Sequence, residues 1–552
     1  MHSATTPSES GAAFDEMVDA SGEPRPGMAG IAGVLDGLGP EGLSERARLR
    51  DAYLDRQGIT FSLSGRERPL PLDLVPRVVA AEEWEQVETG IRQRIRALEM
   101  FLTDVYGPGE ILEDGVISRR LVTSSKHYHR AAFGLVPPNG VRIHVAGIDL
   151  IRDEAGTFRV LEDNLRCPSG VSYVLENRRT LAHVLPEVFA GQQVRSVFEY
   201  PERLLDALRA AAPSDVADPT VAVLTPGVHN SAHFEHAFLA RRMGAELVEG
   251  RDLFCRDDRL WMRTVRGPRP VHVLYRRIDD EYLDPVHFVP DSLLGVPGLL
   301  NAARAGNVAI ANAVGNGVAD DKAVYPFVPA MIDYYLGEIA ILPNVETYDL
   351  SDGDQMRYVL DRLDRMVVKP VDGSGGYGLV IGSQASEAVL AETAATILAD
   401  PRSWIAQPIV NLSTCPTVVG DGAVEPRHVD LRPFAVNDGN ETYVLPGGLT
   451  RVALPQGSLV VNSSQGGGSK DTWVLEEERR EVGTDGRAPP PRVTRVRRSA
   501  VARHHAPVVA DDRLRQQEGQ QQQARTVEAV GVCSDQLGNQ AGVETGTGRG
   551  PC

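Results

Sequence analysis

The amino-acid sequence predicts an α/β (α+β) fold of several units. Apolar runs over residues 141–151 and 158–165 are separated by a short turn, and they lead into a helix-like run over 171–189. Residues 221–248 have the pattern of a strand, a turn, a helix and a second strand, an order typical of an α/β domain. Both ends of the chain lack such periodicity, so we expect disordered termini.

Apolar spacing and turn residues justify the individual elements. Residues 82–106 carry apolar side chains at helical spacing, which predicts a long amphipathic helix. Within the β-α-β segment, the turn is marked by Pro226 and Gly227. The strands that we expect from here on are 221–224, 246–248, 271–275 and 366–369, with a helix over 232–243.

Composition limits the class of protein. The 552 residues suggest two to four units at about 150 residues each. Hydrophobic residues make up 42%, and because no apolar run reaches about eighteen residues we expect no membrane contact. The net charge of −18 opposes phosphate backbones, so nucleic acid is not an expected partner. The five scattered cysteines lack C-x-x-C spacing, which argues against disulfides or zinc and favours a cytoplasmic location.

The acidic hairpin is the most informative segment. A turn over residues 154–157 would place Asp149 opposite Glu162 and Gly147 opposite Asn164, with facing Cβ atoms about 5 Å apart. Because side chains alternate along a strand, two carboxylates and one amide oxygen then share a face. Oxygen donors without histidine or cysteine favour magnesium over zinc.

The same register has further consequences for the hairpin. It places Asp153 opposite Phe158, and it predicts that Val145, Val160 and Phe158 surround the acids on their face. Facing carboxylates in an apolar setting need a compensating cation, which supports a metal site. The alternative interpretation is a surface hairpin with solvated acids.

The glycine loop over residues 373–378 reads Gly-Ser-Gly-Gly-Tyr-Gly. It lies between two apolar strands, so it predicts a β-loop-β flap and not the strand-to-helix turn of a dinucleotide fold. The missing Gly-Lys-Ser/Thr ending excludes a Walker A loop, and a protein kinase would carry its lysine strand after the glycine loop. The remaining interpretation is a flap that approaches phosphate, with Lys369 and Lys322 as candidate phosphate-binding lysines.

Together these segments resemble the ATP-grasp superfamily. The hairpin matches the G-x-D, turn and E-x-N pattern of that fold, with Pro168 and Gly170 following it. Its nucleotide-binding half is matched by Asp321-Lys322, Lys369-Pro370, the 373–378 loop and a hinge strand over 404–408. In most members the metal hairpin follows the glycine flap, whereas here it precedes the flap.

This permuted order, over residues 53–475, resembles the circularly permuted ATP-grasp proteins of type 2. That group is related to glutathionylspermidine synthetase, and the likeness is greatest to its uncharacterised branch. Residues 161–173, Leu-Glu-Asp-Asn-Leu-Arg-Cys-Pro-Ser-Gly-Val-Ser-Tyr, and residues 275–280, Tyr-Arg-Arg-Ile-Asp-Asp, carry the resemblance. It implies a circularly permuted ATP-grasp fold with a pre-ATP-grasp α/β domain.

The resemblance also implies five regions. They are a flexible leader over 1–45, an N-terminal helical region with the metal-binding hairpin over 46–215, a pre-ATP-grasp-like α/β domain over 216–305, an ATP-grasp nucleotide-binding region over 306–476, and a disordered or anomalous tail over 477–552. The tail combines an Arg-rich stretch with a Gln run, and we assign it no catalytic role.

Roles for individual residues follow from the resemblance. The magnesium ligands would be Asp149, Glu162 and Asn164. ATP would be held by Lys322, Lys369, Gly373, Ser374, Gly375, Gly376, Tyr377 and Gly378, with Gln407 at the adenine hinge. Arg432 and Arg451 would bind the transferring phosphoryl group or the acyl phosphate. Many relatives carry an arginine where this chain has Gly147, so Arg432 is the first candidate for the residue that stabilises the transition state, and Arg166 is the second.

The activity that this resemblance implies is an ATP- and magnesium-dependent ligation of a carboxylate to an amine through an acyl phosphate. The expected cofactors are ATP and two magnesium ions, and the expected partners are small-molecule or peptide carboxylates and amines. Two alternatives stay open: a phosphotransferase that makes no amide, and a catalytically inactive ATP-binding scaffold.

Overall fold

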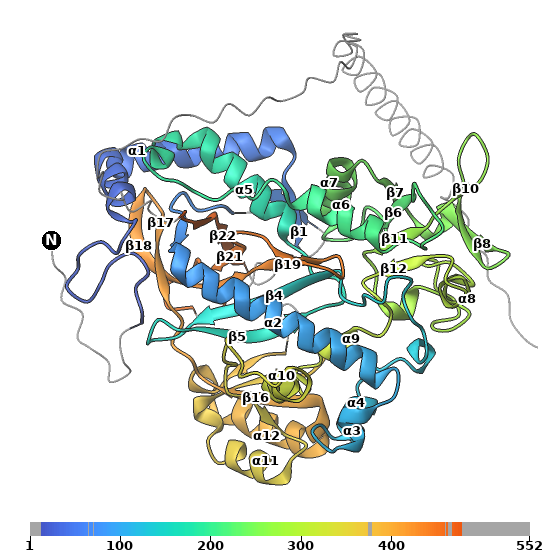
Figure 1. Cartoon of the computed structure of the whole chain (residues 1–552). Helices are drawn as coiled ribbons and strands as arrows, with labels where there is room; N and C mark the ends of the chain where they lie inside the picture. The colour runs from blue at the N-terminus through green and yellow to red at the C-terminus, as the bar shows by residue number, and fades with distance from the viewer. Residues whose placement is uncertain are drawn as a thin grey trace, which may run out of the picture. The chain divides into compact units, whose positions relative to one another are not determined.

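The computed structural model describes residues 13–63, 66–69, 71–373, 378–458, 460–461 and 466–476. The chain divides into two units, Met1–Glu478 and Arg479–Cys552, and every described residue belongs to the first (Figure 1). The expected tail over 477–552 therefore lies outside the described residues, as do residues 1–12. None of the helices in the described ranges combines the length and apolar character of a membrane span.

An antiparallel sheet of eight described strands forms the centre of this unit. The hairpin β4 and β5 lies in it beside strands that come more than two hundred residues later, because β4 pairs with β18 and β19. The strand order is β20-β19-β4-β18-β21-β22, with β5 on β4 and β17 on β18. The strands are β4 (Val145–Arg152), β5 (Phe158–Asn164), β17 (Thr414–Val419), β18 (Ala423–Arg432), β19 (Phe434–Asn437), β20 (Thr442–Val444), β21 (Leu449–Val452) and β22 (Gly468–Lys470).

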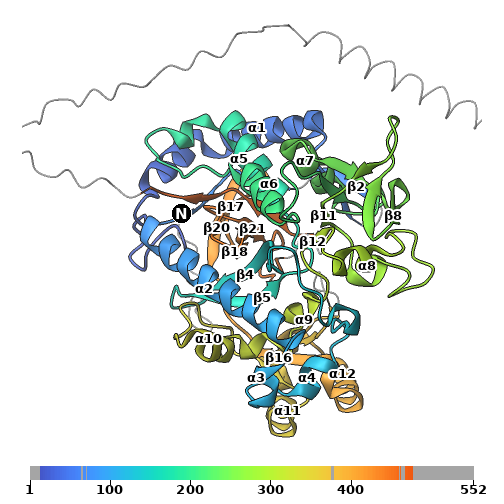
Figure 2. The ribbon, with the colours of Figure 1, turned by 45° about the vertical axis from the view of Figure 1, so that its right-hand side comes forward.

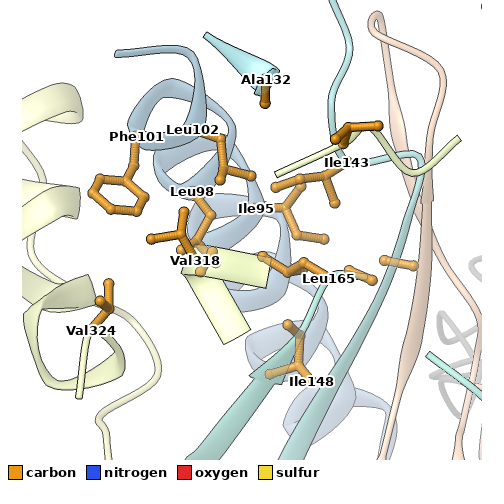
Figure 3. Close-up of a cluster of buried hydrophobic side chains, with 14 of the residues drawn as sticks. Ile95, Leu98, Phe101, Leu102, Ala132, Ile143, Ile148, Leu165, Val318 and Val324 are labelled. Atoms are coloured by element: carbon orange, nitrogen blue, oxygen red, sulfur yellow. The ribbon is translucent and has the colours of Figure 1, made fainter. Parts of the chain in front are cut away.

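The helix α2 (Ala81–Val105) covers one face of the hairpin (Figures 1 and 2). Its residues Ile91, Ile95, Leu98 and Leu102 recur at helical spacing and are buried. They belong to a core that includes Ile148 of β4 (Figure 3). A buried ion pair joins the same two elements, since Arg94 of α2 contacts Asp163 of β5 through both carboxylate oxygens, at 2.6 and 2.7 Å. The hairpin is therefore held rigidly from its α2 side.

A second, parallel sheet with the order β12-β11-β6-β7 contains the predicted β-α-β segment. The helices α6 and α7 pack against β6, and their apolar residues, among them Leu204 and Phe238, share a core with Val221 and Val273. The elements are α6 (Tyr200–Ala210), β6 (Val221–Leu224), α7 (His233–Met243), β7 (Glu246–Val248), β11 (Val273–Arg276), α8 (Leu299–Arg304) and β12 (Ala309–Ala311).

A small antiparallel sheet with the order β13-β16-β14-β15 forms the lobe drawn at the bottom of Figure 1. Its own core includes Leu350, Val359, Val368 and Ile397. The glycine loop connects β14 to β15, as a β-loop-β flap requires. The elements are β13 (Tyr348–Asp349), α11 (Gly353–Leu360), β14 (Met366–Pro370), β15 (Val380–Ile381), α12 (Glu387–Ala399) and β16 (Trp404–Pro408).

The region from residue 13 to 45 differs from the flexible leader that the sequence predicts. The helix α1 (Ala29–Gln57) begins within it and bends at Gly39, before Pro40, while Glu16 is 2% exposed. This order depends on ion pairs and packing with distant residues, which Gly- and Pro-rich composition does not reveal.

The remaining described elements connect or flank these layers. They are β1 (Thr60–Leu63), β2 (Arg66–Pro69), β3 (Arg77–Val79), α3 (Glu110–Glu113), α4 (Arg119–Thr123), α5 (Val171–Val184), β8 (Leu253–Arg256), β9 (Arg259–Met262), β10 (Arg269–Pro270), α9 (Gly317–Asp320), α10 (Val328–Leu336) and β23 (Thr472–Val474).

Candidate functional site

A cavity of about 180 Å³ lies between the acidic hairpin and the small antiparallel sheet. The hairpin contributes Asp149 and Glu162 to its wall, and β14 contributes Lys369. Lys322 and Gly373 also line it. Segments far apart in the sequence thus meet at one cavity, as the motif order requires of a site formed by the hairpin and the glycine loop.

The register of the hairpin contains the predicted pairs and one irregularity. Asp149 faces Glu162 and Gly147 faces Asn164, but Leu150 faces Val160, so that Leu161 is an extra residue in a β-bulge. As a result Leu161 and Glu162 both line the cavity.

The bulge corrects two expectations about neighbouring residues. Val160 was expected among the acids, yet it is fully buried in the core that includes α2. Phe158 pairs with Arg152, whereas the expectation was Asp153. Both differences have one cause, since a bulge changes the pairing by one residue and reverses which side chains face the partner layer.

Two arginines hold the Asp149 carboxylate. Arg432 donates from Nε to Oδ1 at 2.5 Å and from Nη2 to Oδ2 at 2.8 Å, and Arg451 donates from Nη2 to Oδ2 at 2.7 Å. Arg451 is in turn fixed by Asp430, which accepts from its Nε at 2.9 Å and from its Nη2. Burial of Asp149 opposes ionisation, but the attraction of the two guanidinium groups outweighs it and holds the pKa of Asp149 well below its usual range.

Glu162 and Asn164 complete the acidic face. Glu162 is the more open of the two acids, with 24% of its side chain exposed against 1% for Asp149. Its Oε2 lies 3.2 Å from Nζ of Lys322, which also donates to the carbonyl of Gly373 at 2.7 Å. Asn164 donates from Nδ2 to Oδ1 of Asp149 at 3.5 Å. The structure therefore brings all three predicted metal ligands together.

Lys369 and Gln407 form a hydrogen-bonded pair on the opposite wall. Nζ of Lys369 donates to Oε1 of Gln407 at 2.6 Å, and Nε2 of Gln407 donates to Oγ1 of Thr347 at 2.8 Å. Burial is the main reason that the pKa of Lys369 falls to about 8; Lys322 lowers it further and Glu162 opposes the change. The amide of Gln407 thus orients Lys369 while it lines the cavity.

Aliphatic side chains from separate segments form most of the rest of the cavity wall, and sequence reasoning missed them. Each is an ordinary valine, leucine or isoleucine, so nothing in its local sequence marks it as part of a site. They are Ile151, Leu161, Val345, Val367, Leu379, Ile381, Ile409, Val410, Leu412, Val460 and Val461.

Arg166 and the glycine loop are the other predicted parts of the site. Arg166 does not line the cavity; its Nε lies 2.9 Å from Asp320 and its Nη1 lies 3.3 Å from Asp279. Of the glycine loop, Gly373 and Gly378 are described, while Ser374, Gly375, Gly376 and Tyr377 lie outside the described residues. Arg432 and Asn164 are not part of the cavity lining, but both form hydrogen bonds with Asp149, which lines the cavity.

Comparison with known proteins agrees with this arrangement. Residues 76–453 match the family described as circularly permuted ATP-grasp type 2. The chain belongs to this family. Membership in the ATP-grasp family implies the use of ATP. The strands of the permuted hairpin and those of the later half of the chain form one sheet.

Relatives of this circularly permuted ATP-grasp chain occur in several bacteria. An uncharacterized protein of Mycobacterium tuberculosis (strain ATCC 25618 / H37Rv) is 64% identical over 464 residues, which cover 84% of each chain. A protein of Frankia casuarinae (strain DSM 45818 / CECT 9043 / HFP020203 / CcI3), named "Putative glutamate--cysteine ligase 2-2", is 49% identical over 469 residues. The match covers 84% of this chain and 53% of the Frankia protein, so the chain spans about half of that relative.

A solved structure shares the fold. It is a glutathione synthetase like-effector (GSS30) from Globodera pallida in apoform, with a TM-score of 0.54 and 13% identity. The likeness covers 79% of this chain and 98% of that one. At this identity the comparison concerns the fold alone.

The donors at the acidic face of this ATP-grasp site fit magnesium under one condition. Asp149, Glu162 and Asn164 offer oxygen atoms, which magnesium prefers, but both oxygens of Asp149 accept from arginines. Across the ranges that the structure describes, no three His, Cys, Asp or Glu side chains cluster as a metal site of their own. Magnesium commonly binds through one or two carboxylates and the phosphates of a nucleotide. These residues therefore suit an ion that arrives with ATP.

Proposed function

We propose that this protein is an ATP- and magnesium-dependent ligase that joins a carboxylate to an amine, through an acyl phosphate, and releases ADP. The observation that carries the proposal is the pair of opposed charged walls. Asp149 with Arg432 and Arg451 lies on one side of the cavity, and Lys369 lies on the other. ATP-grasp membership supports the use of ATP.

The shape of the cavity supports a nucleotide in one orientation. Its apolar wall, which includes Val345, Val367 and Leu412, suits the faces of an adenine ring, and the cationic end suits phosphates. Lys369 and Lys322 would contact phosphate oxygens, since both reach the cavity and Lys322 touches the first residue of the glycine loop.

The acidic face would hold magnesium. Glu162 and Asn164 would be its ligands together with Asp149, and when bound the ion would offset the phosphate charge and align the γ-phosphoryl group. Arg432 and Arg451 have more N–H groups than one carboxylate can accept, so they can turn toward phosphoryl oxygens as negative charge develops there.

The chemistry that fits these residues has two steps. A carboxylate oxygen of the substrate attacks the γ-phosphorus of ATP, the bond from this phosphorus to the bridging oxygen breaks, and ADP leaves with the electron pair. The amine nitrogen then attacks the acyl carbon, the carbon–oxygen bond to phosphate breaks, and the amide, inorganic phosphate and a proton are released. The protein contributes orientation and charge stabilisation.

A protein nucleophile is not needed for these steps. Cys167 follows the acidic hairpin closely, but its Sγ–H donates to the carbonyl of Ile278 at 3.5 Å, and burial raises the pKa of its thiol. A buried thiol with a raised pKa is a poor nucleophile.

The relatives support the ligase class in a limited way. The Frankia protein carries a ligase name, but this chain matches only about half of it, so that name does not transfer a substrate. The structural neighbour is named as glutathione synthetase-like, and its 13% identity again leaves the substrate open.

A trapping experiment tests the proposal. The purified chain is incubated with MgATP and pooled carboxylates, with hydroxylamine in place of the amine; an acyl phosphate would give a hydroxamate together with ADP. Lys369→Ala should abolish both products. Arg357→Ala, an exposed change on α11, is the matched control and should give both.

The outcomes separate the alternatives. A stable phosphorylated product, formed without any requirement for an amine, would assign a phosphotransferase. Binding of ATP without turnover, together with a cellular phenotype that is indifferent to Glu162→Gln, would assign an inactive scaffold. Absence of both ATP binding and ADP release would refute the ligase.

A further inference from the structure

The segment over residues 14–25, called here the N-terminal strap, packs against the central sheet and the turn of the acidic hairpin. Its backbone joins the beginning of β17, because the Thr414 N–H donates to the carbonyl of Phe14 and the Glu16 N–H donates to the carbonyl of Thr414, both at 2.9 Å. The strap therefore continues the central sheet at the strand next to β18.

The strap also packs on the turn of the acidic hairpin. Gly156 has a φ of +80°, and a Cβ at this position would lie 2.6 Å from the ring of Phe14, so the ring occupies the space that a side chain would need. The guanidinium groups of Arg25 and Arg152 lie 4.1 and 5.1 Å from the centre of the same ring. The strap thus contacts both the turn that joins β4 to β5 and strand β17 of the central sheet.

Glu16 of the strap is fully enclosed and forms a bidentate ion pair. Arg77 donates from Nε at 2.7 Å and from Nη2 at 2.6 Å, and Ser413 donates from Oγ at 2.5 Å. Neither side chain of the ion pair has exposed surface. Burial opposes ionisation of Glu16, yet the attraction of Arg77 keeps the pKa of Glu16 below its ordinary value. The pair is charged, with its geometry fixed at both oxygens.

Arg77 carries this contact toward the cavity. Its third donor, Nη1, bonds the backbone carbonyl of Asp430 at 2.9 Å. The side chain of the same Asp430 fixes Arg451, and Arg451 reaches Asp149 at 2.7 Å. Acids and arginines alternate along this chain of contacts, and Arg77 joins it through the backbone carbonyl of Asp430 and not through its carboxylate.

We propose that Glu16 is a positioning residue of the phosphate end of the nucleotide site, acting through Arg77 and Asp430 on Arg451. Without the Glu16 charge, Arg77 is a buried cation whose closest remaining acceptor at the site is the Asp430 carbonyl. Arg77 would then be drawn to other acids or solvent, and the backbone carbonyl of Asp430 would lose its hydrogen bond from Arg77. The inference rests on the proposed function, because it assumes that Arg451 contacts phosphate.

Two ligands of the full-length protein separate positioning from general destabilisation. MgATP uses both the apolar wall and the charged end of the cavity, whereas adenosine uses the apolar wall alone. Calorimetric titration of Glu16→Gln should show MgATP bound about tenfold more weakly, with adenosine binding unchanged. This is the low end of the range for residues that support a contacting group, because Arg77 and Asp430 stand between Glu16 and Arg451. The exposed Glu23→Gln in the same strap is the matched control and should bind both like wild type.

A second variant guards against a folding failure. Ser413→Ala removes one hydrogen bond to Glu16 and keeps the ion pair. It should therefore weaken MgATP binding by a smaller factor than Glu16→Gln does, and leave adenosine binding unchanged. If Glu16→Gln does not fold, Ser413→Ala decides the question by itself.

The inference is overturned if the folded variants bind MgATP like wild type, or if the binding of MgATP and the binding of adenosine are weakened by the same factor. Either result leaves the proposed ligase intact, because wild-type binding is then still observed. Wild-type protein that binds no MgATP would refute the proposed function and this inference together.

Discussion

Arg432 and Asp149 form a bidentate ion pair across the central sheet, 283 residues apart in the sequence. The pair joins β18 to β4, and it fixes an acid of the permuted hairpin to an arginine of the later half. Arg451 makes a second contact to the same carboxylate. One cluster of charged side chains therefore joins the hairpin to the later half of the permuted chain.

Replacing the shared acid of this cluster tests its role. In Asp149→Asn, Arg432 and Arg451 lose their common countercharge, so ADP release should fall by at least about 100-fold. The free energy of unfolding should fall by roughly 3–5 kcal/mol, as expected when one partner of a buried ion pair is removed. Steady-state ADP release and urea unfolding measure the two effects. Normal turnover by Asp149→Asn would show that Asp149 has no part in catalysis.

Neighbouring residues of β5 face opposite sides and should respond oppositely. Asp163→Asn breaks the buried pair with Arg94 on the α2 side, so it should lower the free energy of unfolding by about 3 kcal/mol while the folded protein binds MgATP normally. Glu162→Gln changes the open cavity side, so it should leave stability nearly unchanged and abolish turnover. Thermal unfolding and MgATP titration of both variants check this, and equal effects of both on binding would contradict the hairpin register.

The pKa of Lys369, about 8 in the free site, gives a pH dependence to ATP binding. Phosphate favours the ammonium form, so the bound pKa is higher than the free pKa, and above pH 8 binding must take up a proton. The dissociation constant of ATP should be flat below pH 8 and rise above it by at most about tenfold per pH unit. Lys369→Arg stays charged and should remove the rise, measured by titration across this pH range.

Removal of magnesium should stop turnover without emptying the apolar part of the site. With a chelator present, ADP release should be lost, while adenosine binding should persist because the wall formed by residues such as Val345 and Leu412 is unaffected. Glu162→Gln should raise the magnesium concentration needed for half-maximal MgATP binding. Metal-independent ADP release would contradict this assignment of the acidic face.

Local patterns explain what the sequence could predict. Alternation along two short strands placed Asp149 and Glu162 opposite each other. The turn is one residue longer than predicted, and the bulge at Leu161 compensates for that extra residue. The β-α-β segment depends on similarly local signals and is present as β6, α7 and β7. The expected fold class is confirmed by the family match and the mixed sheets.

Other features lay beyond sequence reasoning because they depend on distant partners. The bulge at Leu161 is a one-residue irregularity with no distinctive residue type. Burial of Glu16 depends on Arg77, 61 residues later, and the contact of Arg432 with Asp149 spans a still longer separation. The apolar cavity wall likewise forms only when separate segments meet. The roles assigned to the individual site residues stay predictions.

Release of ADP by the purified full-length chain, supplied with MgATP and a broad pool of carboxylates and amines, tests the central claim most directly. The proposed ligase predicts ADP release that requires both a carboxylate and an amine from the pool, and that is lost in Lys369→Ala but kept in Arg357→Ala. No ADP release from wild type, or release at the same rate from Lys369→Ala, would contradict it.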